Sequence, residues 1–567
     1  MVRQLLCIII AGTIIAIAYP LMSEEQEMSC QGWVEFRSFE YNGEDSLAEP
    51  VRLKENEYRN PIMAGFYPDP SIVRVKEDYY LVNSTFAWYP GVPIFHSRDL
   101  VNWRQIGHVL DRPEQLPLDG AGVSRGIFAP SIRFHDDLYY MVTTNVDGTG
   151  NFYVTAENPA GPWSNPVLLP EISGIDPSFF FDDDGRAYIV HNGDPPDNRP
   201  LYQGHRALHL FPFDVKSGRV SGPGKIIVNG GTDIAKKPIW IEGPHIFKRN
   251  GFYYLIAAEG GTAEEHSEVV FRSRTIYGPY ESYSGNPILT QRTLPSSRSE
   301  PITSTGHADF VETQNGEWWA VFLGCEPYED DLYNTGRETF MLPVKWVDEW
   351  PVILAPGKVV PRVVRRPKLP TQAAGTESMT GPLRWIMDFS GKQLPYSLNT
   401  LRNPTSKWWD IDVNKKSLLL NPRPEDLDSR HDPSFIARRL QHIKFSSSVL
   451  VRLNRDNIST DAGLVVFQNE THSYFIGVHV FSFGGKTVFL EKRDNNISEI
   501  ASVGLSEKVN EIMFKVEGAG SQYRFFYRSG NEDWKQLGGV QDGTILSTKK
   551  AGGFVGTFVG MFARSLL

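Results

Sequence analysis

The sequence predicts an all-β protein in two parts, a five-bladed β-propeller followed by a jelly-roll-like β-sandwich. The first observation is a unit that occurs five times, made of a short strand, a turn and a second, aromatic strand. The second is the spacing of these units, roughly 50 to 65 residues, which is slightly longer than typical propeller repeats. The third is that helical periodicity is almost absent. Repeated aromatic strands at this spacing favour a propeller.

The fourth unit shows the pattern most clearly. Residues 240–247 form its first expected strand, Asn250 and Gly251 its turn, and residues 253–255 its second strand. An Asn-Gly pair between two such runs is a hairpin signal. The first strands of the other four units begin near Asp69, Ala129, Asp176 and His307.

The register of the repeat brings acidic residues together. Equivalent first-strand positions of propeller blades converge on the central axis, and here they are Asp69, Asp176, Glu242 and His307, with Ala129 in the second unit. A single Asp before Pro is usually only a turn residue. Three carboxylates and one histidine in the same register, at the mouth of one funnel, predict a reaction centre instead.

Seven short motifs follow one another between about residues 60 and 365. They are GFYPDPS at 65–71, YPGVP at 89–93, GIDPS at 174–178, IEGPH at 241–245, AEGGT at 258–262, STGHAD at 304–309 and TGRET at 335–339. In identity and order they resemble the motifs of family 43 glycoside hydrolases, the inverting β-xylosidases and α-L-arabinofuranosidases. The second half of the chain resembles the β-sandwich that often follows the propeller in the xylosidase-type branch.

The resemblance implies a role for each acidic residue. Asp69 would be the general base, Glu242 the general acid, and Asp176 the residue that orients the acid and keeps it protonated. Inverting hydrolysis needs its acid and base about 6.5–9.5 Å apart, so that a water fits between base and sugar. A neighbouring negative charge raises the pKa of a carboxyl group.

Aromatic residues near the funnel strands are candidates for sugar binding. They are Phe86, Trp88, Phe128 and Trp240, and some of them must simply pack the blades. Trp88 and Phe128 are the best candidates for a platform, because the apolar face of a sugar ring lies on aromatic rings. His266 is expected at the rim of the site.

Two further residues have alternative interpretations. Arg337 is either one half of a surface ion pair or, as the resemblance implies, a donor to sugar hydroxyls or to the acidic cluster, which we favour. His307 is either a histidine satisfied by the backbone or, by the resemblance, a ligand that acts through waters on a structural calcium ion at the propeller axis. One imidazole with water is a weak site for such an oxygen-preferring ion, and no cofactor is expected for the chemistry.

The amino-terminal region predicts secretion. Residues 1–23 combine a basic start with an apolar run and are expected to be a cleaved signal peptide rather than a membrane anchor, and residues 24–58 a flexible extension. Four Asn-X-Ser/Thr triplets, at Asn83, Asn457, Asn469 and Asn496, fit an extracellular protein. Cys30 and Cys325 are the two cysteines outside the signal, and their spacing leaves open whether they pair.

Length and turn residues set the expected domain boundaries. A chain of 567 residues is too long for one core. The propeller is expected over residues 59–360, a proline-containing linker over 361–382, and the sandwich, with its short alternating strands, over 383–567.

Charge and the complete carboxylate set narrow the function. A net charge of −10 without a basic block argues against nucleic acid and fits a neutral oligosaccharide. We expect a secreted, inverting exo-glycosidase that removes β-D-xylose or α-L-arabinofuranose from xylan-derived chains, with xylose favoured by the sandwich. An endo-arabinanase with an open groove and a non-catalytic sugar-binding propeller are the alternatives. The sequence does not indicate the oligomeric state.

Overall fold

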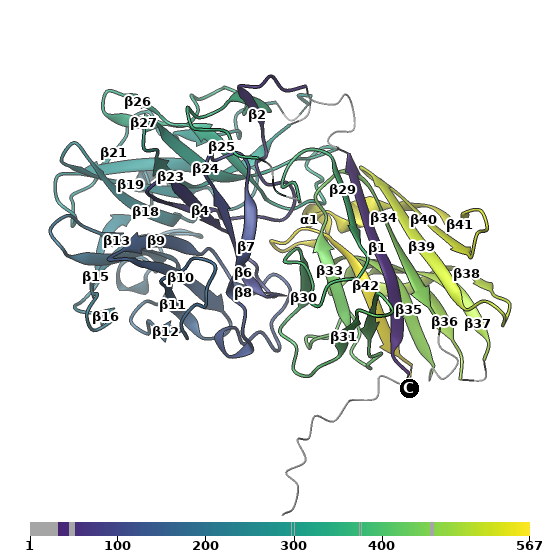
Figure 1. The fold of residues 1–567 in the computed structure, drawn as a ribbon. Helices are drawn as coiled ribbons and strands as arrows, with labels where there is room; N and C mark the ends of the chain where they lie inside the picture. Colours follow the sequence, from purple (N-terminus) through teal and green to yellow (C-terminus); the bar gives the residue numbers. More distant parts are fainter. Residues whose placement is uncertain are drawn as a thin grey trace, which may run out of the picture. The chain divides into compact units, whose positions relative to one another are not determined.

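A computed structural model describes residues 32–44, 52–295, 297–299, 301–373, 375, 377–453, 459–482 and 484–566 (Figure 1). Nearly all of the regular structure is β-strand, and the single α-helix of this part of the chain is one turn long, α1 (Thr548–Ala551). No helix within these residues is long and apolar enough to cross a membrane. The predicted all-β class is therefore confirmed.

Five antiparallel sheets form the blades of a propeller, one for each repeated unit of the sequence. The first blade contains β3 (Ser71–Val75), β4 (Asp78–Val82), β6 (Gly91–Ser97) and β7 (Arg104–Leu110). The second contains β8 (Gly126–Ile127), β9 (Ser131–His135), β10 (Leu138–Val146), β11 (Gly150–Ala156) and β12 (Val167–Leu168). The third contains β13 (Ile175–Phe181), β14 (Ala187–Gly193), β15 (Ala207–Asp214), β16 (Arg219–Val220) and β17 (Lys225–Asn229).

The fourth blade has five strands and the fifth has three. The fourth contains β18 (Glu242–Arg249), β19 (Phe252–Glu259), β20 (Ser267–Ser273), β21 (Glu281–Ser282) and β22 (Leu289–Thr290). The fifth contains β23 (Thr303–Glu312), β24 (Trp318–Cys325) and β25 (Glu338–Pro343). Two small two-stranded sheets accompany them: the hairpin of β26 (Lys345–Val347) with β27 (Trp350–Val352), and the long-range pair of β2 (Glu57–Arg59) with β28 (Val363–Arg365).

The propeller closes into a ring through contacts between its first and fifth blades. The inner strands touch in cyclic order, from β3 through β9, β13, β18 and β23 back to β3. Asp309 of the fifth blade accepts hydrogen bonds from the Ser71 hydroxyl at 2.7 Å and from the Ile72 amide at 3.0 Å. Its carboxylate also pairs with Arg133 of the second blade at 2.8 Å. Met63 forms a β-bridge with Thr339 of β25, which brings the chain before the first blade onto the last blade.

Two eight-stranded antiparallel sheets form the sandwich. One sheet contains β1 (Val34–Glu44), β29 (Leu383–Met387), β31 (Trp409–Asp412), β32 (Ser417–Leu420), β34 (Lys444–Arg452), β39 (Glu511–Ala519), β40 (Gln522–Ser529) and β41 (Lys535–Asp542). The other contains β38 (Asn496–Gly504), β37 (Lys486–Asp494), β36 (His472–Val480), β35 (Thr460–Asn469), β42 (Phe558–Ser565), β33 (Phe435–Arg439), β30 (Leu398–Leu401) and β5 (Trp88–Tyr89).

The expectation of a flexible extension over residues 24–58 is wrong for residues 34–44. These residues form β1, an inner strand of the sandwich that pairs with β32 and β34. Phe36, Phe39 and Tyr41 of this strand are fully buried in the sandwich core. The bulge between Phe36 and Ser38 interrupts the alternation of buried and exposed side chains, and a strand without a local partner is recognised only when its distant partners are known.

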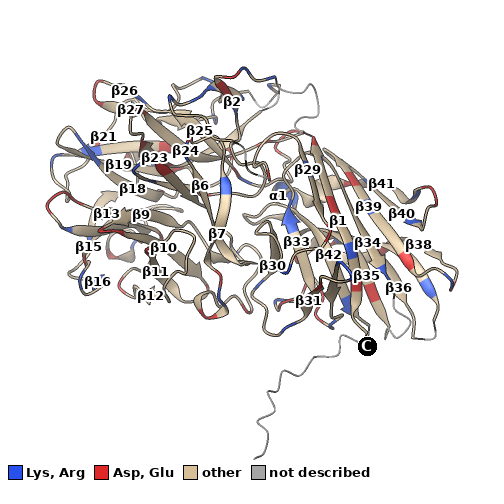
Figure 2. Cartoon of the chain, viewed as in Figure 1, with Lys and Arg blue, Asp and Glu red and all other residues tan. Residues whose placement is uncertain are grey.

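The propeller and the sandwich share a sheet and a core. β5, a short strand between β4 and β6 of the first blade, pairs with β30 of the sandwich. Trp88 on β5 is completely buried and stacks on Phe558 of β42 with ring centroids 3.6 Å apart. Residues 361–382, the expected linker, include β28, and Arg366 of this segment pairs with Asp99 of the first blade at 2.7 Å. Acidic and basic residues are interspersed over both parts (Figure 2).

The structure bears on only part of the predictions about secretion. Residues 1–23, Cys30 and Asn457 lie outside the described residues, so the signal and the pairing of Cys30 with the buried Cys325 stay predictions. Asn83 is buried and donates hydrogen bonds to the Tyr67 and Pro68 carbonyls, so it is no accessible glycosylation site. Asn469 is buried as well, whereas Asn496 lies exposed on β38.

Candidate active site

Irregular backbone marks the predicted site positions on the inner strands. Asp69, Asp176 and His307 adopt left-handed conformations, with φ of 51°, 55° and 52°. The pairing register of the first two strands shifts beside Asp176, Glu242 and His307 in the third, fourth and fifth blades. A bulge redirects a side chain, and a left-handed non-glycine residue persists only where its surroundings impose it. The same distortion in several blades therefore indicates that these side chains belong to one functional site at the propeller axis.

These residues line one cavity of about 350 Å³. Asp69, Asp176, Glu242 and His307 converge there, as their register predicts, although they are up to 238 positions apart in the chain. All four are nearly buried, with exposed fractions of 4% to 7%. The rest of the lining combines aromatic rings, small residues and two arginines, namely Phe86, Arg125, Phe128, Ala129, Ile175, Trp240, Gly261, Thr262, Arg337 and Phe554.

Asp69 is held in its ionised form. Its carboxylate accepts hydrogen bonds from Arg337 Nη1 at 2.8 Å and from the Ser84 hydroxyl at 2.5 Å, and His307 Nδ1 lies 3.8 Å away. Burial alone would raise the pKa of Asp69, but Arg337, His307 and Ser84 outweigh it and leave the pKa below its ordinary value. An ionised carboxylate of this kind is able to accept a proton from water.

Glu242 has the opposite environment. Burial, together with the negative charges of Asp176 and Asp69, holds the pKa of Glu242 well above its ordinary value. Its Oε1 atom has no hydrogen-bond partner among the described residues. Burial and the nearby Asp69 also raise the pKa of Asp176 to about 6, although His307 and a hydrogen bond from the Gly243 amide at 3.1 Å act against them. Glu242 is therefore the carboxyl group best suited to carry a proton at neutral pH.

Arg337 contacts the acidic cluster and does not lie on the protein surface. It is 5% exposed, and its guanidinium binds Asp69 through Nη1 while Nε has no partner within the described part of the chain. It follows Gly336, whose φ of 83° and close approach to Gly556 of the sandwich leave no room for a side chain. The favoured interpretation of Arg337 agrees with this placement.

Two predicted sugar contacts are misplaced. Trp88 forms no platform, because its ring is fully buried between the propeller and the sandwich, where it contacts Phe435, Phe467 and Phe558. His266 does not reach the rim, because it is completely buried and its Nδ1 bonds to the Ser304 carbonyl. Both errors have one cause, since nearness in sequence to a funnel strand does not determine the direction of a side chain.

The other aromatic candidates do line the cavity. Phe86 and Phe128 pack against each other with ring centroids 5.1 Å apart. Trp240 remains 39% exposed and lies under the guanidinium of Arg206 at 5.0 Å. The predicted roles of these three rings toward a sugar stay predictions.

Two residues of the cavity wall were missed. Phe554 comes from the sandwich, and its ring lies 6.1 Å from Phe86 and 6.2 Å from Phe128. Its amide donates to the Ser124 hydroxyl at 2.9 Å, which fixes this loop on the second blade. Arg125 lies beside Phe128 and pairs with Asp147 at 2.5 Å. The apolar run at residues 552–562 is a signal for burial, but it does not tell which residue reaches the site.

The surroundings of His307 offer little for a directly bound metal ion. Among the described residues, no group of three or more His, Cys, Asp or Glu side chains is arranged to hold one. The nearest carboxylate, Asp69, is already bound to Arg337 and Ser84. A calcium ion held mostly by water stays a prediction.

Two carboxyl groups with pKa values shifted in opposite directions, facing one cavity with aromatic walls, are what the hydrolysis of a glycosidic bond requires. Fold and site thus define a glycoside hydrolase of the propeller type. A family model described as glycosyl hydrolases family 43 matches residues 58–351. A second, described as beta xylosidase C-terminal concanavalin A-like domain, matches residues 387–566. The chain belongs to family 43 of the glycosyl hydrolases and is an enzyme.

Individual relatives are similar over both domains. A xylosidase/arabinosidase of Butyrivibrio fibrisolvens is 37% identical over 89% of this chain and 95% of its own length. A non-reducing end alpha-L-arabinofuranosidase, BoGH43B of Bacteroides ovatus, is 35% identical over 90% of this chain and 92% of its own. The crystal structure of a GH43_12 protein retrieved from a capybara gut metagenome shares 40% identity, covers 94% of this chain and all of its own, and superimposes with a TM-score of 0.88.

Proposed function

We propose that this enzyme is an exo-acting, inverting glycosidase that releases β-D-xylose or α-L-arabinofuranose from the non-reducing ends of xylan-derived oligosaccharides, with xylose favoured. The observation that carries the proposal is the cavity of about 350 Å³, lined by aromatic rings, which Asp69, with a lowered pKa, and Glu242, with a raised pKa, both face. The preference for xylose is supported by the β-xylosidase type of the carboxyl-terminal domain, while the xylosidase/arabinosidase relative supports both pentoses.

In the proposed mechanism, Glu242 donates its proton to the glycosidic oxygen as the bond to the anomeric carbon breaks. Asp69 removes a proton from a water that attacks the same carbon from the opposite face, so the released sugar has the inverted configuration. Arg337 and Ser84 orient the Asp69 carboxylate. Asp176 fixes the Gly243 amide beside Glu242, and its negative charge raises the pKa of the acid.

The exo mode rests on the sandwich. Phe554 packs against Phe86 and Phe128 and thereby walls one side of the cavity with a residue of the second domain. A site walled in this way favours a chain end over the interior of a polymer. An endo-arabinanase requires an open groove, and a non-catalytic sugar-binding propeller has no need for two carboxyl groups with opposite pKa shifts, so we favour neither alternative.

The experiment that tests this proposal is product analysis. The enzyme is incubated with aryl β-xyloside, aryl α-arabinofuranoside, xylobiose and linear arabinan, and the products are separated by chromatography while their anomeric form is followed by proton NMR. We expect free pentose from the first three substrates, appearing first as the inverted anomer, and no internal cleavage of arabinan. Release of longer arabinan fragments would favour an endo-arabinanase. A product with the retained anomeric configuration would contradict the assigned roles of the carboxyl groups.

We also propose that the enzyme acts outside the cell on a neutral oligosaccharide. The support is the basic start and apolar run of residues 1–23 and the exposed sequon at Asn496. Expression of the full-length chain, followed by amino-terminal sequencing of the protein recovered from the medium, tests the signal. An intact amino terminus on a cell-associated protein would contradict this proposal.

A further inference from the structure

A second cavity lies where the propeller meets the sandwich, away from the acidic cluster. Its volume is about 190 Å³. The propeller contributes Tyr67 and the β7 residues Arg104 and Gln105, and the sandwich contributes Arg438 and Arg439 of β33. The remaining lining comes from residues 377–379, residues 395–397 and Gln441. None of these residues lines the catalytic cavity.

The two arginines of this cavity are buried and form no salt bridge within the described residues. Each is 2% exposed, and no carboxylate of the described chain lies within ion-pairing distance of either guanidinium. Their planes lie over aromatic rings instead, Arg438 over Tyr41 at 4.5 Å and Arg439 over Tyr67 at 4.6 Å. Buried charges are normally paired, because an unpaired charge is costly to remove from water.

Several polar atoms around the cavity also lack hydrogen-bond partners. Arg438 donates through Nη2 to Gln441 at 2.7 Å, and Arg439 donates through Nε and Nη1 to the Phe66 carbonyl and the Asn399 side chain at 2.8 and 2.9 Å. Four buried atoms remain unpartnered among the described residues: Nε and Nη1 of Arg438, Nη2 of Arg439 and the Ser397 hydroxyl. Since buried polar groups are nearly always satisfied, these donors would be satisfied by an acceptor from outside the chain, a water or an anion.

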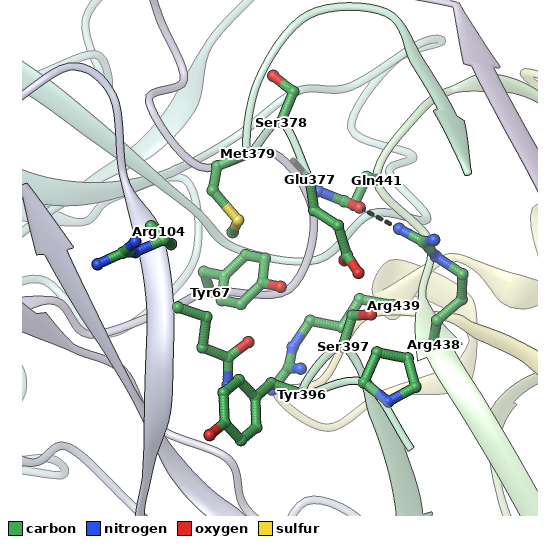
Figure 3. A pocket seen from close by; sticks show the side chains of 12 residues that line it. Tyr67, Arg104, Glu377, Ser378, Met379, Tyr396, Ser397, Arg438, Arg439 and Gln441 are labelled. Atoms are coloured by element: carbon green, nitrogen blue, oxygen red, sulfur yellow. Dashed lines mark hydrogen bonds between the residues drawn. The ribbon is translucent and has the colours of Figure 1, made fainter. Parts of the chain in front are cut away.

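One carboxylate faces the cavity but does not neutralise it. Glu377 is half-buried, and its Oε1 atom accepts a hydrogen bond from the Trp385 indole at 2.9 Å. Figure 3 shows its carboxyl group turned toward the interior, near Tyr67 and the arginines, while the guanidinium of Arg104 points away. Two guanidinium groups against one carboxylate leave the interior with a net positive charge, which an anion would balance.

We infer that this cavity is a binding site for a small tetrahedral oxoanion, inorganic phosphate or sulfate, held by the unpartnered donors of Arg438, Arg439 and Ser397. A volume of 190 Å³ has room for such an ion together with water, because one water molecule takes about 30 Å³ of liquid volume. Guanidinium groups match the geometry of these oxoanions through paired N–H donors. The bound ion would join the propeller to the sandwich and stabilise their junction.

The test is thermal unfolding of the full-length enzyme in rising concentrations of sodium phosphate or sodium sulfate, against sodium chloride at equal ionic strength. A ligand that binds only the native state raises the unfolding midpoint with the logarithm of its concentration above the dissociation constant. We expect this response to both oxoanions and not to acetate. An equal response to acetate would overturn the oxoanion assignment, and equal midpoints in phosphate, sulfate and chloride would overturn the site.

Variants locate the response. Arg438→Gln should lose the dependence on phosphate, whereas Arg384→Gln, which removes the same charge from an exposed position on β29, should keep it. Glu377→Gln keeps an oxygen for Trp385 but removes the negative charge, so calorimetric titration with phosphate should show binding about tenfold tighter. If Arg438→Gln fails to fold, this titration decides the matter, because unchanged phosphate affinity of Glu377→Gln would overturn the inference. An equal loss of the response in Arg384→Gln and Arg438→Gln would do the same.

Discussion

Replacing Glu242 by glutamine separates the roles of the two principal carboxyl groups. The substitution keeps the shape of the side chain, and the Oε1 atom of Glu242 has no hydrogen bond to lose. What disappears is the proton that burial and the neighbouring carboxylates hold on this residue. The fold should therefore survive, and the change in rate should report on proton donation alone.

The size of the effect depends on the leaving group. Xylobiose releases a poor leaving alcohol, so loss of the general acid should lower kcat by about 10²–10⁴-fold, which corresponds to roughly 3–5.5 kcal/mol of activation free energy. Nitrophenyl β-xyloside releases a phenolate that needs little protonation, so its rate should fall far less. Asp69→Asn removes the base that activates water for both substrates, so both rates should fall together.

The pH dependence gives a second check of the same assignment. The reaction needs Glu242 protonated and Asp69 ionised, so kcat/KM should fall as pH rises through the raised pKa of Glu242, and again as pH falls through the lowered pKa of Asp69. Stopped assays on both substrates between pH 4 and pH 9, a range chosen around the ordinary carboxyl pKa, should show that Glu242→Gln loses the basic limb with nitrophenyl xyloside. Equal losses on both substrates, or an unchanged basic limb, would refute the assignment.

Three further predictions concern the residues around this pair. Arg337→Ala should lower kcat/KM by roughly ten- to a hundredfold, since a charged hydrogen bond contributes about 1.5–3 kcal/mol. It should also move the acidic limb of the pH profile to higher pH. The exposed control Arg384→Ala should leave the kinetics unchanged, and an equally small effect of Arg337→Ala would show that Arg337 has only a structural role. Phe554→Ala should raise KM for xylobiose roughly tenfold through lost apolar contact. The control Phe526→Ala on β40, away from the cavity, should leave KM unchanged. Equal KM values for these two variants would show that Phe554 does not contact the substrate. A chain ending near Gly375 should be poorly soluble or inactive, because it exposes Trp88 and leaves β5 without β30; a soluble propeller with full xylobiose activity would contradict this.

The sequence by itself determined the parts of this protein that repeat. Five hairpin units in one register fix the blade number, and the register places Asp69, Asp176, Glu242 and His307 at equivalent positions, so their convergence follows from the local pattern. Position along a strand is a local property, set by the alternation of side chains and by turn residues. The identities of the carboxyl groups and their order could therefore be predicted without coordinates.

Only the tertiary structure revealed the features that depend on contacts between residues far apart in the sequence. The sandwich takes β1 from residues 34–44 and β5 from the first blade, and the resulting core encloses Trp88, which local sequence favoured as a sugar platform. Phe554 reaches the catalytic cavity only because the loop before β42 packs on the second blade through Ser124. The burial and the pKa shift of a residue depend on all of its neighbours, and these neighbours are up to hundreds of residues away in the chain. The local sequence pattern therefore does not predict them.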